Sequence, residues 1–162
     1  MPSDIYAKFG QIEGESTDGV YKGQCSLNSI SHELENEASG DRSTGGGGAK
    51  SIATHREITF TKSFDAASPG LIKACLIGEH MDIVISLCRQ SGKDKQEYLQ
   101  YALTDAYLSG LSHQSADGGG VEEVGVINYG TIKWTYDKTD TKGFSLGKME
   151  ASWNRIKNCE EI

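Results

Sequence analysis

The stretch Ile58–Gly78, ITFTKSFDAASPGLIKACLIG, decides the fold because a strand pattern passes into a helix pattern within it. Its first residues alternate between apolar and polar, which predicts a strand with one buried and one exposed face. Ser68 is then predicted to cap a helix, Pro69 suits its first position, and Gly78 can end it in a left-handed conformation. The stretch therefore predicts a strand followed by a short helix over about residues 69–77.

The predicted helix carries one apolar face, whose members recur at helical spacing. These members are Leu71, Ile72, Cys75 and Leu76. Such a face must be covered, and a sheet is the available cover because the rest of the chain is rich in strand patterns. We therefore expect Leu71, Cys75 and Leu76 to lie in the core or in an interface.

Strand patterns separated by glycine-rich turns fill most of the remaining chain. Predicted strands cover residues 4–12, 82–89, 122–136 and 144–156, and a change of parity within residues 25–34 predicts a bulge near Asn28 or Ser29. Residues 97–113 favour one long kinked strand, with a helix as the alternative, because apolar residues occupy both parities. The large aromatic residues Trp134, Tyr136 and Trp153 are expected in the core or in an interface.

Many strands and a single helix indicate one mainly β domain over residues 1–162. The predicted architecture is a small β-barrel or two packed sheets, with the helix flanking one side. The pattern contains no internal repeat and no domain linker.

The charge and the chain ends argue against two classes of partner. The net charge is −7 and basic residues form no run, so a nucleic-acid surface and an anionic membrane surface are not expected. The N-terminus lacks the pattern of a signal peptide, and no apolar stretch is long enough for a transmembrane helix. The four cysteines lie far apart, which favours reduced thiols in a reducing cytoplasm and no metal site.

Sequence motifs for catalysis or nucleotide binding are weak in this chain. TGGGGAKS over residues 44–51 departs from the phosphate-loop pattern at Thr44 and Ala49, and a strand rather than a helix follows it. The four histidines are scattered, and no nucleophile signature places a serine or cysteine beside a base. The sequence therefore predicts no enzyme, no cofactor and no nucleotide site.

Several short motifs occur together in one order along the chain. They are Lys8 with Gly14-Glu15-Ser16, Phe60-Thr61-Lys62, Ser68-Pro69, Leu71 with Ala74, Cys75 and Gly78, Glu97-Tyr98-Leu99, Ile127-Asn128-Tyr129, Ile132 with Trp134 and Tyr136, and Trp153-Asn154. In this order and spacing the chain resembles the haemolysin-coregulated protein family, Hcp, whose members build the tube of bacterial type VI secretion systems. One departure is the polar segment Asn28 to His32, where relatives often carry tryptophans.

The resemblance implies a single tube domain whose six copies close into a ring, with rings stacked into a hollow tube inside a contractile sheath. The implied partners are further copies of the chain, spike and sheath proteins, and effectors carried in the lumen. The protein is expected to assemble in the bacterial cytoplasm and to leave through the secretion apparatus without a signal peptide. Phage tail-tube proteins share this fold, so a phage-like particle stays an alternative, as does a free secreted effector or enzyme.

Two surfaces of the implied tube are predicted from residue type. Asn28, Ser29 and Ser31 are candidates for the lumen face, because a channel that carries cargo stays wet, and ordinary solvent exposure is the alternative. The loop from Ser39 to Ser51 is too small and polar to bury itself, and long loops of this kind are usually functional or disordered. Its candidate residues for contact between rings are Gly45, Gly46, Gly47, Gly48 and Lys50.

Overall fold

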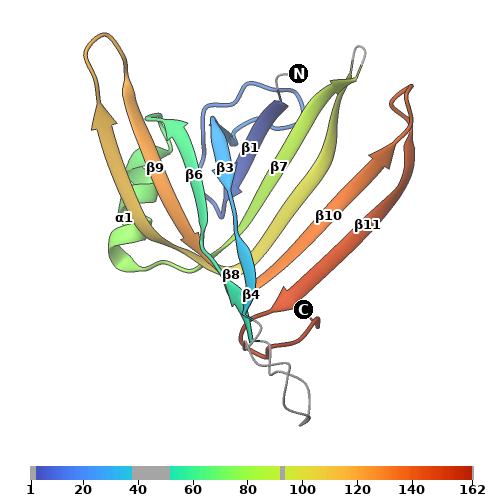
Figure 1. Cartoon of the computed structure of the whole chain (residues 1–162). Coiled ribbons are helices and arrows are strands. Elements are labelled where there is room, and N and C mark those ends of the chain that lie inside the picture. Colours follow the sequence, from blue (N-terminus) through green and yellow to red (C-terminus); the bar gives the residue numbers. More distant parts are fainter. Residues whose placement is uncertain (1–2, 38–51, 92–93, 162) are drawn as a thin grey trace.

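The computed structural model describes residues 3–37, 52–91 and 94–161, and these form a mainly β fold with one flanking helix, as predicted (Figure 1). The strands are β1 (Ser3–Phe9), β2 (Cys25–Leu27), β3 (Ser29–Ser31), β4 (Leu34–Glu37), β5 (Ile52–His55), β6 (Ile58–Ser63), β7 (Met81–Ser91), β8 (Asp94–Ser115), β9 (Val121–Asn128), β10 (Thr131–Thr139) and β11 (Ser145–Asn154). The helix is α1 (Ser68–Ile77).

The long strand β8 organises a sheet of nine strands. Its first half pairs with β7 and β10, and its second half pairs with β9. The chain bends between the two halves at Asp105, whose φ of 50° lies in the left-handed region that aspartate tolerates better than most residues. The predicted long kinked strand is therefore confirmed, and the helical alternative for this segment is wrong.

The bend divides the sheet into two arms that pack against each other. One arm has the order β2-β1-β7-β8-β10-β11, and the other has the order β8-β9-β6-β3. The rings of Phe9 on β1 and Phe60 on β6 meet across the core at 5.2 Å between centroids. Around them lie the fully buried residues Ile58, Leu71, Ile83, Ile85, Ile127 and Ile132. The prediction of two packed sheets thus holds for the arms.

The arms do not close into a barrel within the described residues, which corrects that form of the prediction. Strands β2 and β3 follow each other in the chain, but β2 pairs with β1 and β3 pairs with β6. At the junction the N–H of Asn28 donates to the carbonyl of Thr61 at 2.7 Å. The change of parity predicted near Asn28 is therefore a crossing between the arms rather than a bulge within one strand.

Helix α1 starts differently from the prediction. Ala67 takes the N-cap position, whereas the hydroxyl of Ser68 points into the protein and accepts a hydrogen bond from the N–H of Asp65 at 3.0 Å. Gly78 ends the helix with a φ of 63°, as predicted. No helix in the described ranges is both long and apolar enough to cross a membrane.

The buried face of α1 is narrower than the predicted apolar stripe. Leu71 is buried, Cys75 is partly buried against the core, and Leu76 is 81% exposed. The helix instead buries Ser68, Leu71 and Ala74, which are spaced three residues apart and lie on one face. Leu76 lies on the other side of the helix and faces solvent. Leu76 therefore lies outside the core, and its role in an interface stays a prediction.

The strand predicted over residues 122–136 is two strands, β9 and β10, separated by Tyr129 and Gly130. The N–H of Gly130 donates to the carbonyl of Thr104 on β8 at 3.1 Å. The turn thus lies against β8 where that strand bends, and a Cβ at Gly130 would approach the Cβ of Asp105 to 3.0 Å. The turn also changes which parity faces the core, from that of Ile127 in β9 to that of Ile132 in β10. This change explains why large residues occupy both parities in the segment.

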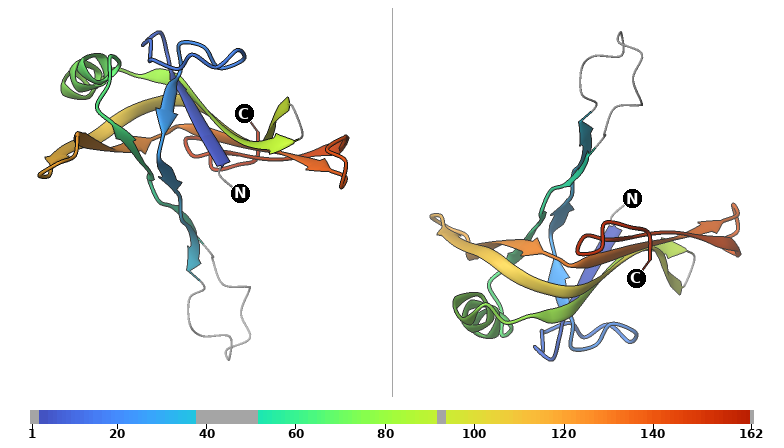
Figure 2. Two further views of the ribbon diagram at one scale, coloured as in Figure 1. Left: turned by 90° about the horizontal axis from the view of Figure 1, so that it is seen from above. Right: turned by 90° about the horizontal axis from the view of Figure 1, so that it is seen from below.

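Strands β4 and β5 form a separate two-stranded sheet that projects from the body of the molecule (Figure 2). Their register pairs Leu34 with His55. The predicted inter-ring residues Gly45, Gly46, Gly47, Gly48 and Lys50 belong to the segment between these strands and lie outside the described residues.

Gly125 on β9 is needed for the packing of Phe60, its cross-strand partner. A Cβ at Gly125 would come within 2.2 Å of the Phe60 ring. We expect Gly125→Ala to lower the free energy of unfolding by about 1–3 kcal/mol, because the ring must move within a packed core. Urea unfolding measures this loss. The matched control is Gly110→Ala on β8, whose added Cβ would meet Val126 only at 3.9 Å. Equal losses in the two variants would contradict this account.

Candidate functional site

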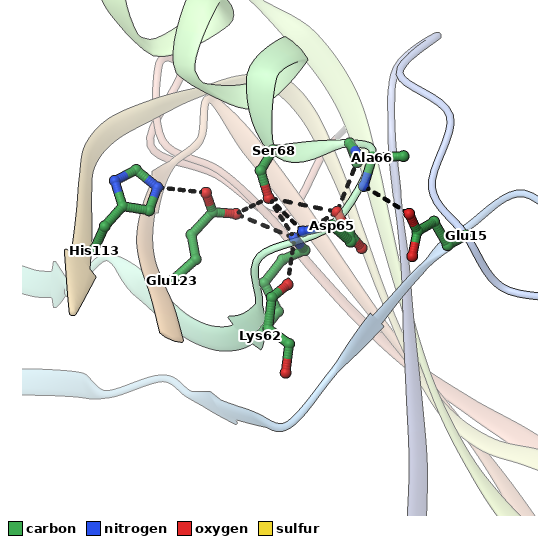
Figure 3. Close-up of polar contacts among 9 residues, drawn as sticks. Glu15, Lys62, Asp65, Ala66, Ser68, His113 and Glu123 are labelled. Atoms are coloured by element: carbon green, nitrogen blue, oxygen red, sulfur yellow. Dashed lines mark hydrogen bonds and ion pairs between the residues drawn. The ribbon is translucent and has the colours of Figure 1, made fainter. Parts of the chain in front are cut away.

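A network of hydrogen-bonded polar side chains holds the start of α1 against β6 and β9 (Figure 3). The ammonium of Lys62 on β6 donates to Glu123 Oε1 at 3.2 Å, to Ser68 Oγ at 3.0 Å and to Asp65 Oδ1 at 2.8 Å. The side chains of Lys62 and Glu123 are fully buried. Because the Lys62–Glu123 ion pair has no contact with solvent, its role is to position α1.

The network extends to β8 and to the loop between β1 and β2. On β8, Nε2 of His113 lies 2.7 Å from the second carboxylate oxygen of Glu123. In the loop, the Glu15 carboxylate accepts a hydrogen bond from the N–H of Ala66 at 3.1 Å. Sequence reasoning missed this network, although Lys62 shares the inward parity of Ile58 and Phe60. That parity was the available signal, and a charged residue on a buried face needs a partner.

A cluster of aromatic and histidine rings lies where the β4–β5 hairpin meets β10 and β11. Trp134 and Trp153 are partly buried against the core. Trp134 stacks on His32 with centroids 6.0 Å apart, and Trp153 stacks on His55 at 6.1 Å. A groove of about 390 Å³ opens beside them, and its lining includes Leu34, Asn36, Thr54, His55, Trp134 and Trp153. Sequence reasoning placed the tryptophans in the core or an interface but did not connect them to the histidines.

The buried thiols are poorly suited to nucleophilic chemistry. All four cysteines are free. Burial raises the pKa of the Cys25 thiol to about 12 and also raises the pKa of Cys88. Both groups are therefore neutral thiols at physiological pH, and they pack as small apolar residues.

The candidate lumen residues are exposed at and just before β3. Asn28, Ser29 and Ser31 are exposed, whereas Ile30 between them is partly buried. The hydroxyls of Ser29 and Thr61 form a hydrogen bond of 2.6 Å across β3 and β6. These residues thus present a polar surface to solvent, and their place in a lumen stays a prediction.

Exposed apolar side chains gather at two opposite ends of the molecule. Figures 1 and 2 show α1 at one end and the β10–β11 hairpin at the other. The helix end exposes Leu76 and Ile77. At the other end β11 pairs only with β10 in the described part of the chain, so its outer edge is free. The exposed apolar residues there are Tyr136, Phe144, Leu146 and Met149.

Comparison with known proteins gives relatives over the whole chain. Protein hcp1 of Pseudomonas aeruginosa is 26% identical over an alignment of 163 positions, which covers 99% of each chain. A solved structure of a type six secretion system protein superposes with a TM-score of 0.90 at 27% identity, covering 99% of this chain and 100% of the other. Hcp1 from Salmonella typhimurium superposes with a TM-score of 0.80 at 25% identity, with the same coverage.

The family described as "Type VI secretion system effector, Hcp" matches residues 6–136. This match includes α1 and strands of both arms but not β11, and it includes most of the motifs on which the resemblance was based. The chain therefore belongs to the Hcp family of type VI secretion proteins.

Proposed function

We propose that the chain is a tube subunit of a type VI secretion system, in which six copies close into a ring and rings stack into a hollow tube. Contraction of the surrounding sheath then expels the tube, which spike proteins tip and which carries effectors in its lumen. The observation that carries this proposal is the match of the Hcp family to residues 6–136, together with relatives that align over their full length.

The distribution of exposed apolar residues supports assembly into a ring. A head-to-tail ring needs two different surfaces on each subunit, because the same contact repeats around the axis. The α1 end and the β11 end are two such surfaces and lie on opposite sides of the molecule (Figures 1 and 2). A free strand edge beside exposed Leu146 and Met149 invites pairing with another chain. We propose that β11 contacts the neighbouring subunit of the ring through this edge.

Gel filtration and electron microscopy of the purified protein test this function. A tube subunit gives a ring-sized oligomer and ring-shaped particles, and its export requires the secretion ATPase and the sheath. A dilute monomer with hydrolytic activity would instead support a free secreted effector or enzyme. Export of rings without the type VI apparatus would point to a phage-like particle.

The inter-ring role of Gly45, Gly46, Gly47, Gly48 and Lys50 is part of this proposal. Ordering a glycine-rich backbone costs about 1 kcal/mol or more per residue, and contacts from a stacked ring can offset that cost. Removal of residues 43–49 is therefore expected to leave a ring-sized oligomer in gel filtration while tubes and secretion are lost. Normal tube formation and export by the shortened protein would show that the segment is a tolerated insertion.

A further inference from the structure

The base of the β4–β5 hairpin is joined to the body of the molecule through one buried hydroxyl. His32 precedes β4 and His55 ends β5. His32 Nε2 lies 2.9 Å from the hydroxyl of Tyr129, and His55 Nδ1 lies 3.1 Å from the same oxygen. Tyr129 is 2% exposed and belongs to the turn between β9 and β10. We call His32, His55 and Tyr129 the histidine clamp.

The hairpin depends on such side-chain contacts for its position. In the described residues β4 and β5 pair with each other and with no other strand. The hairpin continues from the paired strands β3 and β6, and the N–H of Arg56 donates to the Glu33 carbonyl between the two strand pairs. A two-stranded hairpin by itself is marginally stable in water, so further contacts with the body of the molecule help to hold it. Leu34 on β4 is 52% exposed and contributes little buried surface. The histidine clamp and the stacking of its two rings on Trp134 and Trp153 are the side-chain contacts that attach the base of the hairpin to the body of the molecule.

The Tyr129 hydroxyl lies between the two imidazole nitrogens and also lies 3.5 Å from the Arg56 carbonyl, to which it can donate. The N–H of Arg56 donates to the Glu33 carbonyl at 3.0 Å, so the backbone group left to hydrogen-bond the His32 ring is the Arg56 carbonyl. One arrangement of protons satisfies all of these groups: the His32 ring donates one N–H to the Arg56 carbonyl, and its Nε2 accepts the Tyr129 proton. His55 Nδ1 then donates its proton to the Tyr129 oxygen. This arrangement requires both imidazoles to be neutral.

The surroundings disfavour charge on either imidazole. Burial lowers the pKa of His32 and of His55, and the positive charge of Arg155 lowers both further. The hydrogen bond of His32 to the Arg56 backbone raises the pKa of His32 and offsets part of this effect. The Arg155 guanidinium lies 5.0 Å from the centre of the Tyr129 ring and donates to the Tyr129 carbonyl at 3.0 Å. Attraction of a protonated imidazole to its stacked tryptophan acts in the opposite direction. The other ionisable groups nearby are Tyr101, Glu160 on the groove, and the Arg56–Glu35 ion pair at 3.1 Å.

We propose that the histidine clamp is a proton-controlled attachment, which releases the β4–β5 hairpin when His32 and His55 take up protons. A protonated His32 can no longer accept the Tyr129 proton, and two cations then lie beside Arg155. Because the pKa of each histidine is lower in the attached state than the ordinary value of about 6.5, attachment is fully stable above that value and weakens as the pH falls below it.

Tryptophan fluorescence can report the release of the hairpin. Its two tryptophans are Trp134 and Trp153, and each stacks on one histidine of the clamp, with interplanar angles of 23° and 27°. Protonation or departure of either imidazole changes the surroundings of a tryptophan. Intrinsic fluorescence therefore reports on the clamp without an added label.

The test compares the full-length protein at about pH 8 and about pH 5, on either side of the ordinary histidine pKa. Hydrogen exchange in residues 32–37 and 52–56, corrected for its intrinsic pH dependence, is expected to accelerate by at least about tenfold at the lower pH. Exchange in β7 is expected to stay unchanged, and tryptophan fluorescence is expected to shift with a midpoint below pH 6.5. Unchanged exchange in the hairpin, or equal acceleration in β7, would overturn the proposal.

Three variants separate the clamp from general acid sensitivity. In H32Q/H55N the Gln oxygen replaces the acceptor Nε2 and the Asn amide replaces the donor Nδ1, but neither group titrates in this range. This variant is expected to keep the hairpin protected at about pH 5. Y129F removes the shared hydroxyl and is expected to speed hairpin exchange at both pH values.

The matched control is H80N, because His80 pairs with Asp105 away from the hairpin, at 2.6 Å between Nδ1 and Oδ1. It is expected to keep the wild-type transition. Gel filtration of each variant reports ring assembly separately, so the outcome for the clamp does not depend on the proposed tube function. A transition that persists in H32Q/H55N, or that is lost in H80N, contradicts the assignment.

Discussion

Replacing Lys62 with methionine is expected to lower the free energy of unfolding by about 3–5 kcal/mol, the range found when one partner of a buried ion pair is removed. Lys62 is the one cation that contacts both Asp65 and Glu123 in the network. Without it the fully buried Glu123 carboxylate keeps only the Ser68 hydroxyl and His113 Nε2 as partners. The measurement is urea unfolding at a fixed protein concentration, since assembly adds to apparent stability.

The network also predicts different losses of stability for substitutions at Lys62 and at Glu123. Glu123→Gln leaves Lys62 paired with Asp65 at 2.8 Å, and the Gln side chain can still accept a hydrogen bond from Lys62. We therefore expect Glu123→Gln to cost less stability than Lys62→Met. The double variant K62M/E123L should recover part of the loss, because well-packed apolar residues often replace a buried pair without penalty.

An exposed ion pair provides the control for Lys62. Lys133 and Glu150 lie 3.2 Å apart across β10 and β11, and their side chains are 37% and 51% exposed. Lys133→Met is expected to change the free energy of unfolding by no more than about 1 kcal/mol. If Lys62→Met costs no more than Lys133→Met, the buried network does not hold α1 against the sheet.

The sequence predicts the elements of the fold well where neighbouring residues decide them. Pro69 and Gly78 mark the ends of α1 correctly, because the first fits the first turn and the second adopts a positive φ. The kink of β8 was visible in its change of parity. The path of the chain at Asn28 was visible only as an irregularity, because the partner strands β1 and β6 that separate there are distant in sequence.

The candidate sites depend on contacts that sequence patterns do not carry. Lys62 and Glu123 are 61 residues apart, and His32 and Tyr129 are 97 residues apart. A lysine in an alternating strand is usually solvated, so parity alone did not identify Lys62 as buried. Serine is a common helix-capping residue, but the Ser68 hydroxyl points into the protein and accepts a hydrogen bond from the Lys62 ammonium. In each case a tertiary contact rather than the local preference sets the position of the side chain.

Placing lysines at Leu146 and Met149 is expected to prevent assembly of the proposed ring and to leave monomers. Strand β11 is the outer strand of its arm, and Leu146 and Met149 are 60% and 62% exposed in the subunit. Burying one such side chain contributes about 1.5–3 kcal/mol, and a lysine at the same place would have to be desolvated. The association constant of each contact should therefore fall by about a hundredfold or more. Gel filtration and analytical ultracentrifugation measure the change.

Because both side chains already face solvent in the subunit, the melting temperature of the L146K/M149K monomer should stay close to that of dilute wild-type protein. This separates loss of assembly from loss of folding. Val20 offers a matched control, since it is apolar and 77% exposed but lies in the loop between β1 and β2. Val20→Lys adds the same charge and should leave the ring intact. A ring that survives in L146K/M149K would remove β11 from the ring contact, and the exposed residues Leu76 and Ile77 of α1 would then be the next surface to test.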